Sequence, residues 1–225
     1  MTLLEFARGP ALWFSLAVLA AGTLWRVLAI WRLGARPDLS EPRATRPLAG
    51  ALQGVLVHML PRKDVSRGTA LAYFNGYVYH LGLAVIVFGY LPHIHFVKRL
   101  TGLSWPALPE PAVFVVVGLT FVSLFIALLA RLTDPVRRLL SGFDDYFSWL
   151  VVFLPLATGM IAIHQSYAPA AAPLPPLDPL PLAVHLLSVE LLFVWLPFGK
   201  LVHAFLVFFS RGVTGAALSR KGAAV

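Results

Sequence analysis

Five long runs of hydrophobic residues, separated by segments rich in charged residues and proline, dominate the sequence. They cover residues 11–31, 73–91, 111–130, 146–164 and 182–209. A helix needs about 20 mostly apolar residues to cross the hydrocarbon core of a bilayer, and each run is close to that length or longer. We therefore predict an all-α integral membrane bundle of five transmembrane helices that forms a single domain over residues 1–225.

Composition strengthens this interpretation. Hydrophobic residues make up 59% of the chain and charged residues 12%, with a mean hydropathy of +0.80, which is more apolar side chain than a soluble domain of this size can cover. The first run has the position of a secretory signal. Because its apolar length exceeds that of a typical signal core and only Arg8 precedes it, we interpret it as a helix that remains in the protein.

The basic residues predict the orientation of the bundle. Most of them lie in the loop between the first two runs, in the loop between the third and fourth runs, and in the C-terminal tail; they are Arg32, Arg36, Arg43, Arg46, Arg62, Lys63, Arg67, Arg131, Arg137, Arg138, Arg211, Arg220 and Lys221. The opposite side holds Arg8, Lys98 and Arg99. The positive-inside rule then places the N-terminus outside and the C-terminus in the cytoplasm of a bacterium or archaeon. This distribution accounts for the net charge of +8 without a nucleic-acid partner.

Two connections between the runs have distinct compositions. The inner loop, residues 33–68, is rich in Pro and Arg, and its apolar stretch 48–60 suits the membrane interface or a cytoplasmic partner. The outer loop, residues 166–181, is rich in proline and has no basic residue. We expect it to form an extended cap over a pocket that faces lipid or quinone.

Seven histidines and no cysteine define the candidate chemistry: His58, His80, His93, His95, His164, His185 and His203. Without cysteine the chain holds no iron–sulfur cluster, no covalent c-type haem and no disulfide. Ionisable residues within a membrane are costly and are functional by default. For His58 and His164 a structural, hydrogen-bonded role is an equally good interpretation.

The remaining histidines form two levels across the predicted membrane. On the second helix His80 lies in the inner half and His93 at the outer end, about 20 Å apart; on the fifth, His185 is outer and His203 inner. Eighteen residues make five helical turns, so His185 and His203 share a face of a straight helix, although Pro197 is expected to kink or shorten it. Two opposed pairs of imidazoles suit two b-type haems, each held by one axial ligand from each of two facing helices.

These segments also carry a family resemblance. The stretch "HLLSVELLFVWLPFGKLVHAF", residues 185–205, resembles the last helix of the respiratory nitrate reductase gamma subunit, a di-haem cytochrome b, and "YHLGLAVIVFGYL", residues 79–91, resembles its second helix. Residues 131–150, with "DDYF", are more similar to the membrane cytochromes b of sulfite-reductase-linked electron-transfer complexes. The resemblance assigns His80 and His203 to an inner haem and His185 to an outer one.

One position departs from the family pattern. The second histidine of helix two is expected ten residues after His80, where this chain has Tyr90. We expect His93 to replace it as the outer ligand. His95 is the alternative, because ideal helical phase places it nearer the His80 face. A ligand at His164, or the loss of the outer haem, also stays open.

The resemblance implies a haem-containing, quinol-oxidising electron-transfer subunit of a respiratory oxidoreductase complex. Electrons would pass inward to a cytoplasmic iron–sulfur subunit and then to a catalytic subunit, because this chain does not act on the terminal substrate. Candidate acceptors for the quinol proton are His95, His164 and Glu110. The lysine expected near the third helix is absent. The alternatives are a haem-free proton-relay transporter and a cytochrome b561-like transmembrane reductase.

Overall fold

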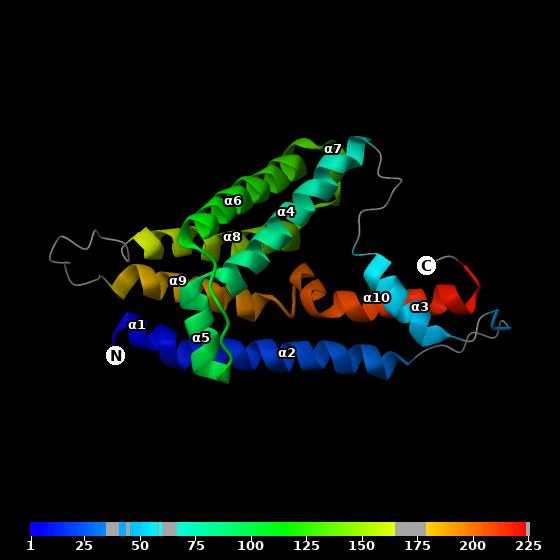
Figure 1. The fold of residues 1–225 in the computed structure, drawn as a ribbon, viewed down its shortest axis with the longest axis horizontal. Coiled ribbons are helices and arrows are strands. Elements are labelled where there is room, and N and C mark those ends of the chain that lie inside the picture. The colour runs from blue at the N-terminus through cyan, green and yellow to red at the C-terminus, as the bar shows by residue number, and fades with distance from the viewer. Residues whose placement is uncertain (35–40, 44–45, 58, 60–66, 165–178, 224–225) are drawn as a thin grey trace. The chain divides into compact units, whose positions relative to one another are not determined.

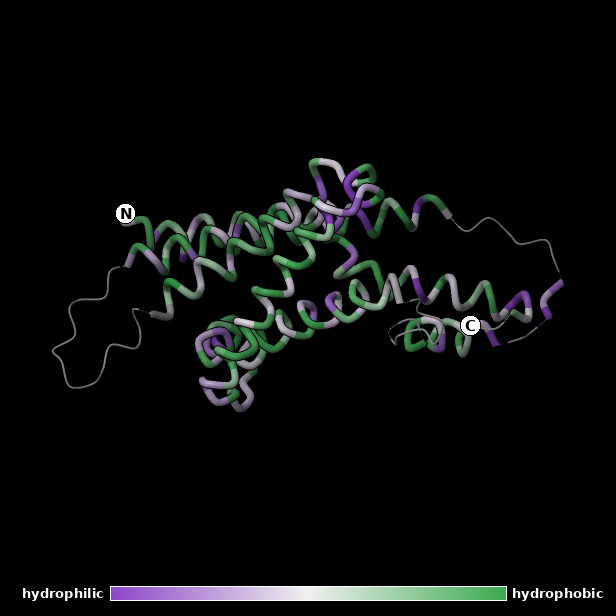
Figure 2. Tube along the Cα trace, turned by 90° about the horizontal axis from the view of Figure 1, so that it is seen from above, coloured by the Kyte–Doolittle hydropathy of each residue, from purple (hydrophilic) through white to green (hydrophobic). Residues whose placement is uncertain are grey.

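The computed structural model describes residues 1–34, 41–43, 46–57, 59, 67–164 and 179–223 (Figure 1). Within these ranges the chain forms helices and connections and no strand, which confirms the all-α prediction. Five helices are long and apolar enough to cross a membrane: Leu3–Leu33, Ala70–Gly89, Glu110–Thr133, Phe143–Ala162 and Lys200–Arg220. Figure 2 shows hydrophobic positions along most of the helical length and hydrophilic positions mainly near helix ends. The chain is therefore a multi-pass membrane protein.

The chain divides into two compact units. Unit 1 comprises Met1–Val65 and Leu182–Val225, and unit 2 comprises Ser66–Pro181. Unit 1 contains α1 (Leu3–Phe6), the π-helical turn η1 (Ala7–Ala11), α2 (Leu12–Leu33), α3 (Pro47–Val57), most of α9 (Pro179–Trp195), the 3₁₀ turn η3 (Lys200–Val202) and α10 (His203–Arg220). Unit 2 contains α4 (Arg67–Gly89), α5 (Leu91–Thr101), α6 (Glu110–Thr133), α7 (Pro135–Leu140) and α8 (Phe143–His164).

The first membrane helix of unit 1 begins earlier than its apolar run suggests. Thr2 and Glu5 form a capping box, in which each side chain accepts a hydrogen bond from the other residue's backbone N–H. Pro10 is accommodated within the π turn. The helix ends at Gly34, whose φ of 63° is open to glycine at no steric cost. The helical segment thus spans Leu3–Leu33 rather than 11–31.

The predicted helix 182–209 is wrong, because two helices replace it. The chain leaves α9 after Trp195 and re-enters a helix at His203, with Pro197 and Gly199 in the intervening turn. Proline cannot donate the hydrogen bond that would continue α9. The fifth membrane-spanning candidate is Lys200–Arg220, and α9 is a shorter apolar helix. His185 and His203 therefore lie on different helices and do not share one continuous face.

In unit 1, α3 packs antiparallel against α10 through glycine. A Cβ atom added to Gly54 would lie 2.7 Å from the Cα of Gly215, and one added to Gly50 would lie 2.3 Å from the Cβ of Ser219. The two backbones are thus in contact, as in membrane helix pairs built on small residues four positions apart. We call this contact the glycine seam; it is formed by Gly50 and Gly54 of α3 and Gly215 and Ser219 of α10.

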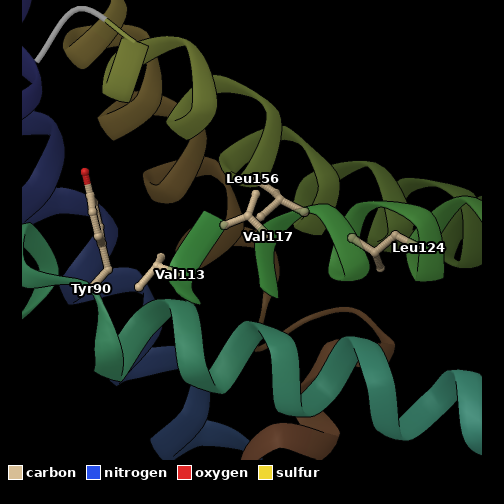
Figure 3. Packing of buried hydrophobic residues seen from close by; sticks show 5 residues of the cluster. All are labelled: Tyr90, Val113, Val117, Leu124 and Leu156. Carbon is tan, nitrogen blue, oxygen red and sulfur yellow. The ribbon is translucent and has the colours of Figure 1, made fainter. Parts of the chain in front are cut away.

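In unit 2, α6 runs antiparallel to both α4 and α8, and the three helices surround an apolar core. Figure 3 shows five buried residues of this core, which are Tyr90, Val113, Val117, Leu124 and Leu156. Between α4 and α6, the Asn75 side chain donates to the carbonyl of Ser123 (2.9 Å), and the Ser123 hydroxyl lies 2.8 Å from Asn75 Oδ1. Both side chains are buried, so this polar contact fixes the register of two otherwise apolar helices.

The end of unit 2 that holds α7 is organised by two aspartates. Asp134 caps α7 by accepting from the backbone N–H groups of Val136 and Arg137. Asp145, in the first turn of α8, accepts from the N–H of Gly142 (3.0 Å) and forms an ion pair with Arg131 (2.7 Å). The hydrogen bond from Gly142 caps the start of α8.

Candidate functional site

The predicted ligands divide equally between the two units. His80 on α4 and His93 on α5 belong to unit 2, whereas His185 on α9 and His203 on α10 belong to unit 1. Each predicted axial pair therefore takes one histidine from each unit. The pairing of His80 with His203, and of His93 with His185, stays a prediction.

His80 lies on the regular part of α4. Its Nδ1 donates to the carbonyl oxygen of Gly76, one turn earlier, over 2.7 Å. A carbonyl oxygen only accepts, so Nδ1 carries the hydrogen, and in the neutral tautomer Nε2 carries the lone pair. The ring of Tyr79 lies 4.4 Å from that of His80, centroid to centroid. The imidazole is thus oriented by its own helix and presents the nitrogen that a metal ion uses.

His203 has the same arrangement on a different backbone. It is the first residue of α10 and directly follows the turn η3. Its Nδ1 donates to the carbonyl of Lys200 over 2.8 Å, which again places the lone pair on Nε2. The position of this imidazole is therefore set by the break between α9 and α10.

Arg26 of α2 stabilises that break. Its Nε donates to the carbonyl of Pro197 (3.1 Å) and its Nη2 to the carbonyl of Phe198 (3.0 Å). Gly22 lies against the Pro197 ring, where an added Cβ would come within 2.7 Å of Pro197 Cγ. A guanidinium at the C-terminal end of α9 satisfies carbonyls that the helix no longer uses and complements the helix dipole. The sequence gives no signal for this contact, because Arg26 and Pro197 are 171 residues apart.

His93 lies just beyond a second break. The helix α4 ends at Gly89, Tyr90 is extended (φ −85°, ψ 127°), and α5 begins at Leu91. The predicted continuation of one helix from His80 to His93 is therefore wrong. The Nδ1 of His93 donates back across the break to the carbonyl of Ile86 (2.9 Å), and the Tyr90 ring packs edge-on against the imidazole with centroids 5.3 Å apart. Burial lowers the pKa of His93, and the hydrogen bond to Ile86 offsets part of that effect.

Three carbonyls at the end of α4, those of Ile86, Phe88 and Gly89, accept hydrogen bonds from outside the helix. Trp105 Nε1 donates to the carbonyl of Phe88, and the backbone N–H of Leu108 donates to that of Gly89 (2.9 Å). Together with His93 on Ile86, they satisfy a helix end that would otherwise leave polar groups exposed to apolar surroundings. His93 therefore has a structural role in the fold, whether or not it binds a metal.

The other predicted site residues have plainer surroundings. His95 is exposed on α5, and Glu110 is half-buried in the first turn of α6. His164 ends α8, but its side chain, like all of His58 and most of the outer loop 166–181, lies outside the described residues. The chain direction brings α5, the start of α6 and the end of α8 to the same end of unit 2. His95, Glu110 and the His164 backbone therefore lie at the same end of unit 2.

His185 and Glu190 lie on α9. His185 is half-buried, and its carbonyl accepts from the Ser188 hydroxyl (2.6 Å). Glu190 is 5% exposed, and neither of its carboxylate oxygens has a hydrogen-bond partner among the described residues. Within the described part of the chain, no three His, Asp or Glu side chains gather around a common point. Axial ligation of haem takes only two imidazoles, so it does not require such a cluster.

Comparison with known proteins yields one informative match. No family model matches the chain, and no solved structure matches it. A protein of Nitratidesulfovibrio vulgaris strain Hildenborough is 30% identical over 227 residues, which cover 97% of this chain and 95% of that protein. The alignment thus covers nearly the full length of both proteins. The chain therefore belongs to the same family as this N. vulgaris protein.

Proposed function

We propose that this chain is a haem b-containing subunit of a respiratory complex in the cytoplasmic membrane, and that it oxidises quinol and passes electrons to a cytoplasmic iron–sulfur subunit. One observation carries the proposal. Three of the four candidate ligands, His80, His93 and His203, donate Nδ1–H to a backbone carbonyl. A second-shell hydrogen bond of this kind fixes the tautomer and ring orientation of a metal-binding histidine.

The donor set fits two b haems. The chain has no cysteine thiolate to offer to iron, and histidine imidazoles are common axial ligands of haem iron. His80 and His203 would hold the inner haem, and His93 and His185 the outer one. Bound haem would supply a one-electron carrier whose potential depends on axial ligands and on the exclusion of water. The apolar helices that carry these histidines provide the low-dielectric surroundings.

The outer side would hold the quinol. Oxidation of a hydroquinone requires groups that accept its two hydroxyl protons. His95 is exposed at the end of unit 2 that the proposed orientation places outside, Glu110 is half-buried there, and His164 ends α8 at the same level. These residues would take protons toward the outer face, while the electrons move inward.

The inner side would meet the soluble partners. Arg131, Arg137 and Arg138 lie at the end of unit 2 where α6, α7 and α8 connect. Arg137 is paired with Asp134 (3.5 Å) and Arg131 with Asp145 (2.7 Å). A basic inner surface suits an acidic face of an iron–sulfur subunit, and the catalytic subunit would bind beyond it.

The test is a reduced-minus-oxidised spectrum of the purified protein, with haem quantified per polypeptide. We expect b-type absorbance and two haems. The His203→Ala variant should lose one of them, while the matched variant His95→Ala, which changes an exposed histidine, should keep both. Absence of b-type absorbance in the wild-type protein would contradict the proposal and favour a haem-free proton-relay transporter. A normal haem content in His203→Ala would contradict the ligand assignment.

A further inference from the structure

The glycine seam determines which face of α3 points away from the protein. Gly50 and Gly54 contact α10 so closely that a Cβ added to Gly215 would lie 2.2 Å from the Gly50 carbonyl oxygen. The residues half a turn away, at positions 48, 52 and 56, must therefore point in the opposite direction. The rotation of α3 about its own axis is thus fixed by backbone contact.

The outward face is a row of leucines. Leu48, Leu52 and Leu56 are 80%, 67% and 64% exposed, and they follow one another at intervals of four residues. Gln53 is the only polar side chain in α3, and the helix has no charged residue. A helix with such a face is stable only when something apolar covers it.

Basic residues gather where the segment before α3 meets the C-terminal end of α10. The backbone N–H of Arg43 donates to the carbonyl of Arg220 (2.9 Å), which brings the segment before α3 to the C-terminal end of α10. Arg46 precedes α3 directly and Lys221 follows α10. Within the described residues 41–43, 46 and 220–223, the four cations Arg43, Arg46, Arg220 and Lys221 are accompanied by one acidic residue, Glu41. We call this group the basic end of the α3–α10 helix pair.

An apolar face next to a cluster of cations is typical of a helix that binds an anionic membrane surface. In this chain α3 is also held at the membrane by its partner, because α10 is part of the span candidate Lys200–Arg220. α3 is held along the half of that helix nearest the basic end. We propose that α3 is embedded in the inner leaflet beside α10, with its leucines in contact with lipid acyl chains and the basic end at the anionic headgroups.

Cysteine labelling tests this directly, because the chain has no native cysteine. The full-length variants Leu52→Cys and Gln53→Cys would each carry a nitroxide label and be reconstituted into vesicles of phosphatidylcholine and phosphatidylglycerol. Collision of each label with oxygen, which concentrates in lipid, would be compared with collision with a water-soluble nickel complex. Leu119→Cys, 57% exposed within the span Glu110–Thr133, gives the acyl-chain reference, and Glu41→Cys, at the basic end, gives the headgroup reference.

We expect the ratio of oxygen to nickel collisions at Leu52 to be close to that at Leu119, several-fold above that at Glu41, and higher than that at Gln53. A ratio at Leu52 equal to that at Glu41, or no higher than that at Gln53, would overturn the proposal. A label at Leu52 that collides with neither oxygen nor nickel in native membranes, but does collide with oxygen in the vesicles, would overturn it as well. The surface that covers Leu52 would then be a protein. Leu48→Cys provides a second label on the same face if Leu52→Cys fails to insert.

Discussion

The glycine seam gives a quantitative prediction with a built-in control. Gly212 and Gly215 lie on the same helix, three residues apart, and alanine at either position improves helix propensity by about 1 kcal/mol. At Gly212 an added Cβ would meet Val55 Cγ2 at 3.8 Å, which is an ordinary contact. At Gly215 it would lie 2.2 Å from the Gly50 carbonyl oxygen and 2.8 Å from the Gly54 Cα. These are backbone atoms, so α3 itself must move.

Forcing a methyl group into a close-packed contact costs about 1–3 kcal/mol. The propensity gain is the same at both positions. The free energy that holds α3 against α10 should therefore be lower in Gly215→Ala than in Gly212→Ala by this packing cost. α3 should then separate from α10 more often, and its amide hydrogens should exchange about 5- to 150-fold faster in Gly215→Ala than in Gly212→Ala. Hydrogen–deuterium exchange of the α3 peptide, in detergent or nanodiscs, measures this ratio. Equal exchange of α3 in the two variants would show that the helices do not touch through Gly215.

Three further predictions concern the candidate ligands and the polar contacts. His93→Ala and His185→Ala should remove the same haem signal from the difference spectrum and His95→Ala should not; a His95→Ala spectrum matching that of His185→Ala would reverse the assignment. Arg26→Gln should lower the free energy of unfolding by about 1.5–3 kcal/mol for each charged hydrogen bond lost, and Arg26→Lys by less, as thermal unfolding in detergent would show. Asn75→Ala leaves a buried hydroxyl without its side-chain partner and should cost about 1–3 kcal/mol in the same assay, whereas an unchanged melting temperature would mean that the contact does not set the register.

The membrane helices could be predicted from sequence because their signal is local. Hydrophobic length alone indicated five spans, and five helices meet that criterion, including Glu110–Thr133 almost at the predicted boundaries. The end of the fifth span could not be predicted in the same way. The stretch that contains Gly212 and Gly215 has weak hydropathy, which suggested that the helix ended at residue 209. The helix continues to Arg220 because these small residues admit α3, a contact between segments far apart in the chain.

The two helix breaks differ in how visible they are in the sequence. Pro197 and Gly199 are strong signals for a helix end, and a kink was expected there. The full break also needs a donor for the carbonyls it exposes, and Arg26 lies too far away in sequence to be connected with them. The hydrophobic run 73–91 continues through Tyr90, so it predicts no break there. The extended conformation of Tyr90 is supported by its burial in the core formed with Val113 and Val117.

Because of this second break, the hydrogen bond of His93 is stronger evidence for a ligand role than those of the other histidines in the proposed site. In His80 and His203 the Nδ1 hydrogen bond goes to a carbonyl four or three residues earlier, a local geometry open to a histidine on many helices. In His93 it goes seven residues back, to Ile86, and exists only because the chain turns at Tyr90. Tyr90, which stands where the cytochromes b that the sequence resembles are expected to have a histidine, is thus the residue at the turn that lets His93 reach Ile86. His95, two positions on, is exposed and has no such constraint from the break, so the geometry favours His93 as the outer ligand.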